Sequence, residues 1–288
     1  NVCRSVRLRR AGGRHIRPRL NPLKILDLPV HDVTLAEAVA LVASAVAEAS
    51  PHQVVTANAL MLNAAQSDPA LAAAIRGADL VVPDGAGLLL ASRLSGRPLR
   101  ERVPGIALMQ ALCEAAARRG WRVLLMGAKP GVALAAAERL RSDIPGLAIS
   151  AVRDGYFRRD EEPAVLHDIR VATPDLLFVG LGMDRQERWI AQNLNALGAR
   201  VVMGVGGALD VLAGRLPRAP VRLQSIGGEW LWRLAHEPSR WRRMMGLPAC
   251  MLRVLWRSAL WRAVLLGGAL LMLGLLAYGR TFRQPFLW

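Results

Sequence analysis

The sequence predicts an α/β protein whose body is a mainly parallel sheet with helices on both faces. Short apolar segments alternate with helical segments at regular intervals between residues 21 and 220, which is the pattern of successive strand–helix–strand units. Nearly every apolar segment ends in glycine or a polar residue. After residue 220 the alternation stops and the chain becomes rich in Trp, Arg and then Leu, which predicts a C-terminal helical appendage that associates with a membrane.

The net charge of +16 is concentrated at the two ends of the chain. Residues 1–20 contain seven Arg and no acid, and residues 230–288 contain nine Arg and one Glu, whereas residues 21–229 are nearly neutral. Basic ends favour a membrane surface or a polyanion as partner, and nucleic acid is not expected because zinc-ligand spacing and RNA-recognition signatures are missing. The cysteines are scattered, which predicts neither a disulfide framework nor a metal cluster and fits a cytosolic body.

The first segments are a basic arm, a short strand and a helix. Residues 1–20 have no core-forming pattern and no apolar segment typical of a signal peptide, so we expect a disordered arm. Residues 24–28 predict an edge strand. Thr34 and Glu37 have the spacing of a capping box, which predicts a helix from there to about residue 50.

The stretch 54–87 carries the strongest signal for a functional site. It contains two apolar strands on either side of helical sequence, and a crossover of this length makes the strands parallel, with both carboxyl ends at one edge of the sheet. Thr56 and Asn58 follow the first strand and Asp84 follows the second, at the edge where open parallel sheets bind ligands. In the alternative interpretation Asn58 only caps a helix and Asp84 only starts a turn.

The rest of the body continues the same alternation. Predicted strands cover residues 122–126, 147–152, 175–179 and 200–203, and predicted helices begin near Asp68, Val103, Gly131 and Arg185. Glycines at strand ends let backbone N–H groups approach a phosphate, so their gathering on one edge predicts a nucleotide or nucleotide-sugar site. A tight turn needs glycine with or without a ligand, which is the simpler interpretation of each loop alone.

The C-terminal part divides into two predicted regions. Residues 221–247 predict short helices rich in Arg and Trp that form an appendage separate from the sheet, and residues 248–288 predict a membrane-anchoring helix. This last region contains an uncharged run from residue 263 to 279, which spans about 26 Å as a helix. Trp261 and Tyr278 flank the run at the positions of an aromatic belt, and the heavier arginine load before it predicts a cytoplasmic body.

The start of the last region predicts an amphipathic helix in the membrane interface. Leu252, Leu255 and Trp256 recur at helical spacing. Arg253 and Arg257 fall on the other face, where we expect them at the lipid surface. A buried core helix is the alternative for the apolar run that follows, although a run that is apolar on all faces favours the membrane.

Nine motifs occur along the chain in a fixed order. They are Thr56-Ala57-Asn58, Asp84-Gly85, Arg102-Val103-Pro104-Gly105, Asp154-Gly155-Tyr156-Phe157, Pro174-Asp175-Leu176-Leu177-Phe178-Val179-Gly180-Leu181-Gly182, Gln186-Glu187-Arg188-Trp189, Gly206-Gly207-Ala208-Leu209-Asp210, Arg218-Ala219-Pro220 and Glu229-Trp230-Leu231-Trp232-Arg233. Together they resemble the bacterial WecG/TagA/CpsF glycosyltransferase family (glycosyltransferase family 26) over about residues 23–245. The resemblance implies a Rossmann-like body, residues 21–220, and an appendage that completes the active site at the membrane.

The resemblance also implies a function. Such an enzyme transfers a hexosyl or N-acetylhexosaminyl group, with inversion, from a UDP-sugar to an undecaprenyl-diphosphate-linked saccharide in cell-envelope or exopolysaccharide biosynthesis. We therefore expect it at the cytoplasmic face of the inner membrane, with no cofactor. The resemblance further suggests a homo-oligomer that forms through the surface the appendage would cover.

The resemblance assigns roles to individual positions. Asp84 resembles the general base that deprotonates the acceptor hydroxyl, and Thr56 and Asn58 would hold sugar and acceptor beside it. The implied donor-binding residues are Arg102 and Gln186 at the sugar, Gly127 and Tyr156 at the nucleotide, and Gly207 and Asp210 in the last glycine motif.

Arginines are expected to replace a metal ion in this site. An inverting displacement needs one base and a group that stabilises the departing diphosphate. No Asp-x-Asp metal motif occurs in the sequence, and Arg233, Arg240 and Arg243 resemble, in spacing, appendage arginines that hold the diphosphate. Arginine suits this role because it is permanently charged and forked for phosphate. A basic helix at a lipid surface is the alternative interpretation of these residues.

Two other function classes fit the predicted fold. An NAD-dependent oxidoreductase would carry Gly-x-Gly-x-x-Gly after the first strand, where this chain has Thr56-Ala57-Asn58. A non-catalytic, membrane-tethered nucleotide-sugar-binding protein would keep the glycines but would have no use for Asp84 beside Thr56. The donor sugar is left open, because Ala107 and residues 183–185 depart from the family pattern near the expected donor pocket.

Overall fold

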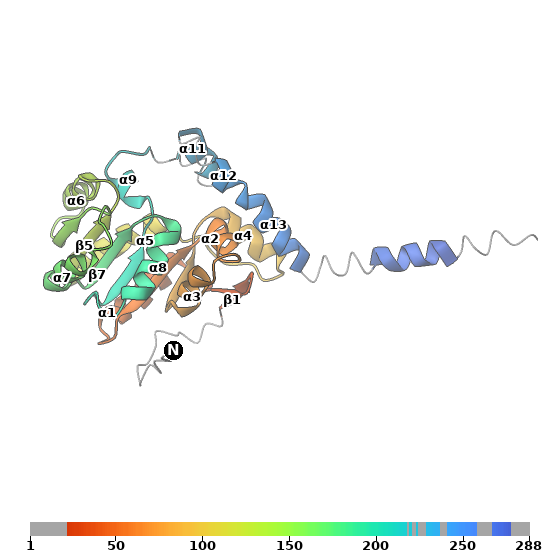
Figure 1. Cartoon of the computed structure of the whole chain (residues 1–288), viewed down its shortest axis with the longest axis horizontal. Coiled ribbons are helices and arrows are strands. Elements are labelled where there is room, and N and C mark those ends of the chain that lie inside the picture. Colours follow the sequence, from red (N-terminus) through yellow and green to blue (C-terminus); the bar gives the residue numbers. More distant parts are fainter. Residues whose placement is uncertain are drawn as a thin grey trace, which may run out of the picture.

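The computed structural model describes residues 22–217, 219–220, 223, 229–236, 241–257 and 267–277, without the side chains of Asp184, Glu229, Arg233, Arg242 and Arg243. The body contains strands β3 (His52–Ala57), β4 (Leu80–Pro83), β5 (Arg122–Gly127), β6 (Ala148–Arg153), β7 (Leu176–Gly180) and β8 (Val201–Gly204). They form one sheet in the order β4-β3-β8-β7-β5-β6, and every neighbouring pair is parallel (Figure 1). The predicted parallel α/β body is confirmed.

Helices cover both faces of this sheet. One face packs against α1 (Leu35–Val46), α5 (Gly105–Arg119), α6 (Val132–Asp143) and α9 (Ala208–Leu212). The other packs against α2 (Ala59–Ala64), α3 (Pro69–Gly77), α4 (Ala86–Leu94), α7 (Glu162–Ala172) and α8 (Met183–Asn193). Because strand side chains alternate between faces, Val54 joins the first core and its neighbour Val55 joins the second.

The helix starts follow local side-chain chemistry. The Thr34 hydroxyl accepts a hydrogen bond from the Glu37 N–H (3.2 Å), and the Glu37 carboxylate accepts one from the Thr34 N–H (2.9 Å). The capping box predicted at α1 is therefore confirmed. At α3 the Asp68 carboxylate accepts from the Leu71 N–H, and Pro69 occupies the first helical position.

The edge strand predicted at residues 24–28 is wrong. These residues contribute to two short strands, β1 (Leu23–Ile25) and β2 (Leu28–Val30), which pair antiparallel with each other outside the main sheet. The hairpin turns at Leu26 and Asp27, both with positive φ. After β2 the His31 N–H donates to the Val81 carbonyl, so the chain covers the outer edge of β4 without joining the sheet as a strand.

The C-terminal helices are α11 (Glu229–His236), α12 (Trp241–Met244) and α13 (Gly246–Arg257), and residues 267–277 form a further helix. Figure 1 shows α11 and α12 beyond the body and α13 returning along α2 and α4. Cys250 and Val254 of α13 are buried in the core that α2 and α4 share. Within the described part of the chain, no helix combines the length and apolarity needed to cross a membrane.

The arginines of α13 are exposed and also contact the body, and their expected position at a lipid surface stays a prediction. Arg253 donates from Nη1 to Asn63 Oδ1 (2.7 Å), and Arg257 donates from Nη1 to Asp27 Oδ2 (2.6 Å). The side chains of Leu252 and Trp256 are about two-thirds exposed. The orientation of α13 therefore leaves an apolar stripe outside the protein.

Candidate active site

The predicted catalytic residues lie at the carboxyl ends of two neighbouring strands, β3 and β4. Ala57 is paired with Pro83, and the Asp84 N–H donates to the Ala57 carbonyl at 2.6 Å. A Cβ added to Gly85 would lie 3.8 Å from the Asn58 Cβ, so Asn58 and the Asp84-Gly85 turn are neighbours. Both polar side chains are half-buried. The edge therefore has a carboxylate residue and an amide residue at neighbouring positions.

Asn58 also has a structural role. Its Oδ1 accepts from the Met61 N–H at 3.0 Å and caps α2, while its Nδ2 lies 3.6 Å from the Met183 sulfur. The helix-capping interpretation of this residue is confirmed. The cap fixes the side chain at the sheet edge. The contact with Met183 joins the start of α2 to the start of α8.

Thr56 lies beneath the edge rather than on it. Its side chain is buried, and its hydroxyl donates to the Gly204 carbonyl of β8 at 3.1 Å. Gly105, the first residue of α5, packs so closely on Thr56 that an added Cβ would lie 3.2 Å from the Thr56 methyl. These contacts tie β3 to β8 and α5, and the predicted contact of Thr56 with substrate stays a prediction.

The loop that carries Arg102 returns to the same edge. The Val103 N–H donates to the Pro83 carbonyl at 2.8 Å, which brings the half-buried Arg102 next to the end of β4. Two residues earlier, Arg100 donates to the carboxylates of Asp32 and Glu37, and Arg100 holds the pKa of Glu37 below its usual value. This surface cluster was not predicted as part of the site, and it fixes the loop before Arg102.

The predicted nucleotide side lies at the ends of β5, β6 and β7. Gly127 has φ +140°, and an added Cβ would lie 2.5 Å from the Gly180 carbonyl oxygen, so only glycine fits there. The Gly155 N–H donates to the Ala128 carbonyl, and Tyr156 next to it is 66% exposed. This end combines closely packed, buried glycines with the exposed ring of Tyr156. Four strand spacings, about 19 Å, separate it from Asp84.

Gln186, expected to line the donor-sugar pocket, is only 2% exposed. Its Oε1 accepts from the Gly206 N–H at 3.0 Å, and its Nε2 donates to Glu187 Oε1 at 3.0 Å. Glu187 is fully buried and also accepts from Gln53 Nε2 at 3.2 Å. Burial raises the pKa of Glu187 to about 7, against the opposing effect of these two hydrogen bonds. Sequence reasoning missed Glu187 and Gln53, although a glutamine inside an apolar strand is a signal for a buried partner.

The last glycine motif forms the turn between β8 and α9. Gly206 has φ +52°, and Gly207 precedes the first turn of α9, which contains Asp210. A Cβ added to Gly207 would lie 3.9 Å from Asp210 Oδ2, so the two predicted donor-binding residues are neighbours. The Asp210 carbonyl also accepts from the Arg215 N–H. This turn lies at the end of β8, between the two parts of the edge described above.

The predicted diphosphate-binding arginines are described only in part. Arg233 lies in α11 and Arg243 in α12, but their side chains, and the whole of Arg240, lie outside the described residues. Within the described part of the chain, no group of three or more His, Cys, Asp and Glu residues could hold a metal ion.

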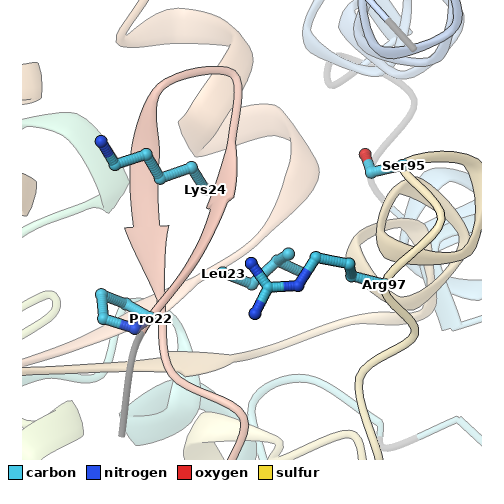
Figure 2. Close-up of a pocket in the computed structure, with 5 residues that line it drawn as sticks. All are labelled: Pro22, Leu23, Lys24, Ser95 and Arg97. Atoms are coloured by element: carbon cyan, nitrogen blue, oxygen red, sulfur yellow. The ribbon is translucent and has the colours of Figure 1, made fainter. Parts of the chain in front are cut away.

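A surface pocket of about 450 Å³ lies elsewhere, between the β1 strand and the end of α4 (Figure 2). Its lining residues are Pro22, Leu23, Lys24, Ser95 and Arg97. None of the predicted site residues is among them. The chemistry of the molecule therefore has to be sought at the carboxyl edge of the sheet.

The comparisons with known proteins agree with the motifs at that edge. The model of the WecG/TagA/CpsF glycosyl transferase family matches residues 23–264. A relative from Bacillus spizizenii, named N-acetylglucosaminyldiphosphoundecaprenol N-acetyl-beta-D-mannosaminyltransferase, is 36% identical over 202 residues, or 70% of this chain and 78% of the relative. A protein of the same name from Staphylococcus aureus is 35% identical over 201 residues, again 70% and 78% of the two chains. This chain belongs to the WecG/TagA/CpsF family of glycosyltransferases.

Proposed function

We propose that this protein transfers a sugar, with inversion and without a metal ion, from a UDP-sugar to an undecaprenyl-diphosphate-linked saccharide. The observation that carries the proposal is the hydrogen bond from the Asp84 N–H to the Ala57 carbonyl, which supports a position of Asp84 near Asn58 and the Arg102 loop at the sheet edge. The names of the two relatives describe transfer of N-acetylmannosamine to a lipid-diphosphate N-acetylglucosamine. We therefore favour an N-acetylhexosamine as the donor sugar.

In the proposed reaction Asp84 is the general base. It takes the proton of the acceptor hydroxyl while the acceptor oxygen attacks the anomeric carbon and UDP departs from the opposite side. Asn58 and Arg102 orient the two sugars, and Gly127 and Tyr156 bind the nucleotide. Arg233, Arg240 and Arg243 neutralise the diphosphate as its charge develops, the role a metal ion has in many other sugar transferases.

The substrate also determines where the enzyme works. An undecaprenyl chain stays in the bilayer, so the active site has to meet its acceptor at a membrane surface, which we propose is the cytoplasmic face of the inner membrane. Leu252 and Trp256 on α13, and the exposed leucines of the helix at residues 267–277, supply apolar surface for attachment there. An anchor in the region 248–288 therefore belongs to the proposal.

The test is acceptor-dependent UDP release by the detergent-solubilised full-length chain. Donors are UDP-N-acetylmannosamine, UDP-N-acetylglucosamine and UDP-glucose, and the acceptor is a synthetic lipid-diphosphate N-acetylglucosamine, with and without EDTA. We expect release with one donor, unchanged by EDTA. Loss of release in EDTA contradicts the role of the arginines. Clear UDP binding with no release from any donor favours the nucleotide-sugar-binding protein instead.

A further inference from the structure

Glu187 is a fully buried carboxylate whose contacts lead to the active-site edge. It lies on α8, and its carboxylate accepts hydrogen bonds from Gln186 Nε2 (3.0 Å) and Gln53 Nε2 (3.2 Å). Both partners are neutral amides. Burying a carboxylate without a cation is costly, so a glutamate at this position calls for an explanation other than stability.

The contacts of Glu187 continue into the β8–α9 turn. Gln186 accepts through Oε1 from the Gly206 N–H at 3.0 Å. Glu187 Oε1 itself packs on Gly204, where an added Cβ would meet the carboxylate oxygen and the Gln186 amide. The Gly204 carbonyl in turn accepts the Thr56 hydroxyl. The Glu187 carboxylate thus contacts Gly204 directly and Gly206 through Gln186, both in the turn at residues 204–207.

The chemistry of the amide explains why a carboxylate is needed. A glutamine amide has one accepting and one donating end, and it can rotate by half a turn with little change of shape. Only one orientation lets Gln186 accept from Gly206. Glu187 selects this orientation. An ionised carboxylate can only accept hydrogen bonds, so it requires the NH₂ end of the Gln186 amide. In the reverse orientation the Gln186 carbonyl would face the carboxylate, and the Gly206 N–H would face a second donor.

We propose that Glu187 is a positioning residue of the glycosyl-transfer site, which holds the turn at residues 204–207 in the shape that binds the UDP-sugar. The inference rests on the proposed function, because Gly207 and Asp210 in and after this turn are donor-binding residues only under that proposal. Glu187 acts through Gln186 and does not touch substrate. Its contribution is to fix the orientation of the Gln186 side-chain amide.

The decisive variant is Glu187→Gln, which keeps the shape of the side chain but gives it an NH₂ group. Both neighbours, Gln186 and Gln53, now donate to a group with only one accepting end, so they compete for it, and the orientation of Gln186 is no longer selected. Assays at pH 8 keep the wild-type carboxylate ionised, since its pKa is about 7. We expect the donor KM to rise about tenfold, the effect of losing one hydrogen bond to a charged group, with a smaller change in kcat.

A second variant tests the route through Gln186. Gln186→Met removes the amide, and we expect it to raise the donor KM as much as Glu187→Gln does. The double variant should then show no further rise, since both residues act through one hydrogen bond. The matched control is Asp175→Asn, a carboxylate-to-amide change at the opposite edge of the sheet, where Asp175 accepts from the Arg122 N–H. It should leave the donor KM unchanged.

Hydrogen exchange supplies a readout that does not depend on catalysis. In the ligand-free full-length chain, peptides that contain residues 204–207 should exchange faster in Glu187→Gln than in wild type or Asp175→Asn. An unchanged KM and unchanged exchange overturn the inference, and so does a lower melting temperature with no change in either. If wild type transfers no sugar at all, the proposed function fails, and the exchange result alone decides whether Glu187 holds the turn.

Discussion

The carboxyl edge of the sheet has two ends, one at β3 and β4 and one at β5 and β7, and they differ in the residues they place there. At the ends of β3 and β4 the half-buried Asn58 and Asp84 occupy neighbouring positions, Asn58 lying against the Asp84-Gly85 turn. At the ends of β5 and β7 the chains approach so closely that Gly127 can have no side chain, and these glycines are buried beside the exposed Tyr156. Because reactivity needs side chains and nucleotide binding can use backbone N–H groups, we expect chemistry at the first end and nucleotide binding at the second.

The largest expected effect comes from Asp84→Asn. The amide cannot take the acceptor proton, so we expect kcat for sugar transfer to fall about a thousandfold, the scale of a lost general base. The measurement is UDP release at saturating donor and acceptor. Asp143→Asn, a change at the exposed carboxylate at the end of α6, is the control and should keep wild-type turnover. If the Asp84→Asn enzyme kept most of its turnover, Asp84 would not be the general base.

Gly127→Ala should damage the other end. Its Cβ would lie 2.5 Å from the Gly180 carbonyl oxygen, which belongs to the backbone and cannot move aside. We expect a loss of about 3 kcal/mol in unfolding free energy and weaker UDP binding, measured by denaturant titration and calorimetry. Gly146→Ala is a matched control, because Gly146 also has positive φ but nothing lies within 4 Å of its added Cβ. Equal losses in the two variants would mean that the close β5–β7 approach has no special importance.

Glu187 lies beside the β8–α9 turn, between the two ends, and its titration should make stability depend on pH. Its pKa is about 7 in the folded protein, against an ordinary value of 4.5, so the folded state binds the proton more tightly than the unfolded state. The contribution of this proton to the unfolding free energy is complete below pH 4.5 and is lost as pH rises through about 7, a change of about 3 kcal/mol. Between pH 5 and pH 8, the unfolding free energy of the wild type should therefore fall by more than that of Glu187→Gln. Equal falls would contradict the raised pKa.

The smallest expected effects concern the attachment of α13. Arg257 and Asp27 are 51% and 74% exposed, so Arg257→Ala should lower the unfolding free energy by only about 0.5 kcal/mol. Val254 is 3% exposed, and Val254→Ala should cost about 2 kcal/mol because it leaves a cavity between α13 and the body. Thermal unfolding of both variants tests this order. A larger loss in Arg257→Ala would mean that ion pairs, and not apolar packing, hold α13.

Most of the body could be predicted because its signals are local. The capping box of Thr34 and Glu37, the Asp68-Pro69 helix start and the buried strands all follow from neighbouring residues. The β1–β2 hairpin could not be predicted, since strands of three residues are too short to show a period.

The site could be predicted less fully, because its side chains depend on distant partners. Asp84 beside Asn58 follows from two parallel strands, and sequence order is enough to expect it. The burial of Gln186 depends on Glu187 and on Gly206, which is twenty residues away along the chain. Arg253 turns toward the body because Asn63 accepts its hydrogen bond, and nothing in the sequence of α13 itself specifies that partner.

The most direct test of the division between the two ends is UDP binding by Asp84→Asn, measured by calorimetry on the full-length chain. If chemistry and nucleotide binding occupy opposite ends of the edge, the dissociation constant for UDP should stay within about twofold of wild type, since an intact distant site binds independently. A loss of UDP binding comparable to the loss of turnover would contradict the account, because Asp84 would then belong to the nucleotide site itself.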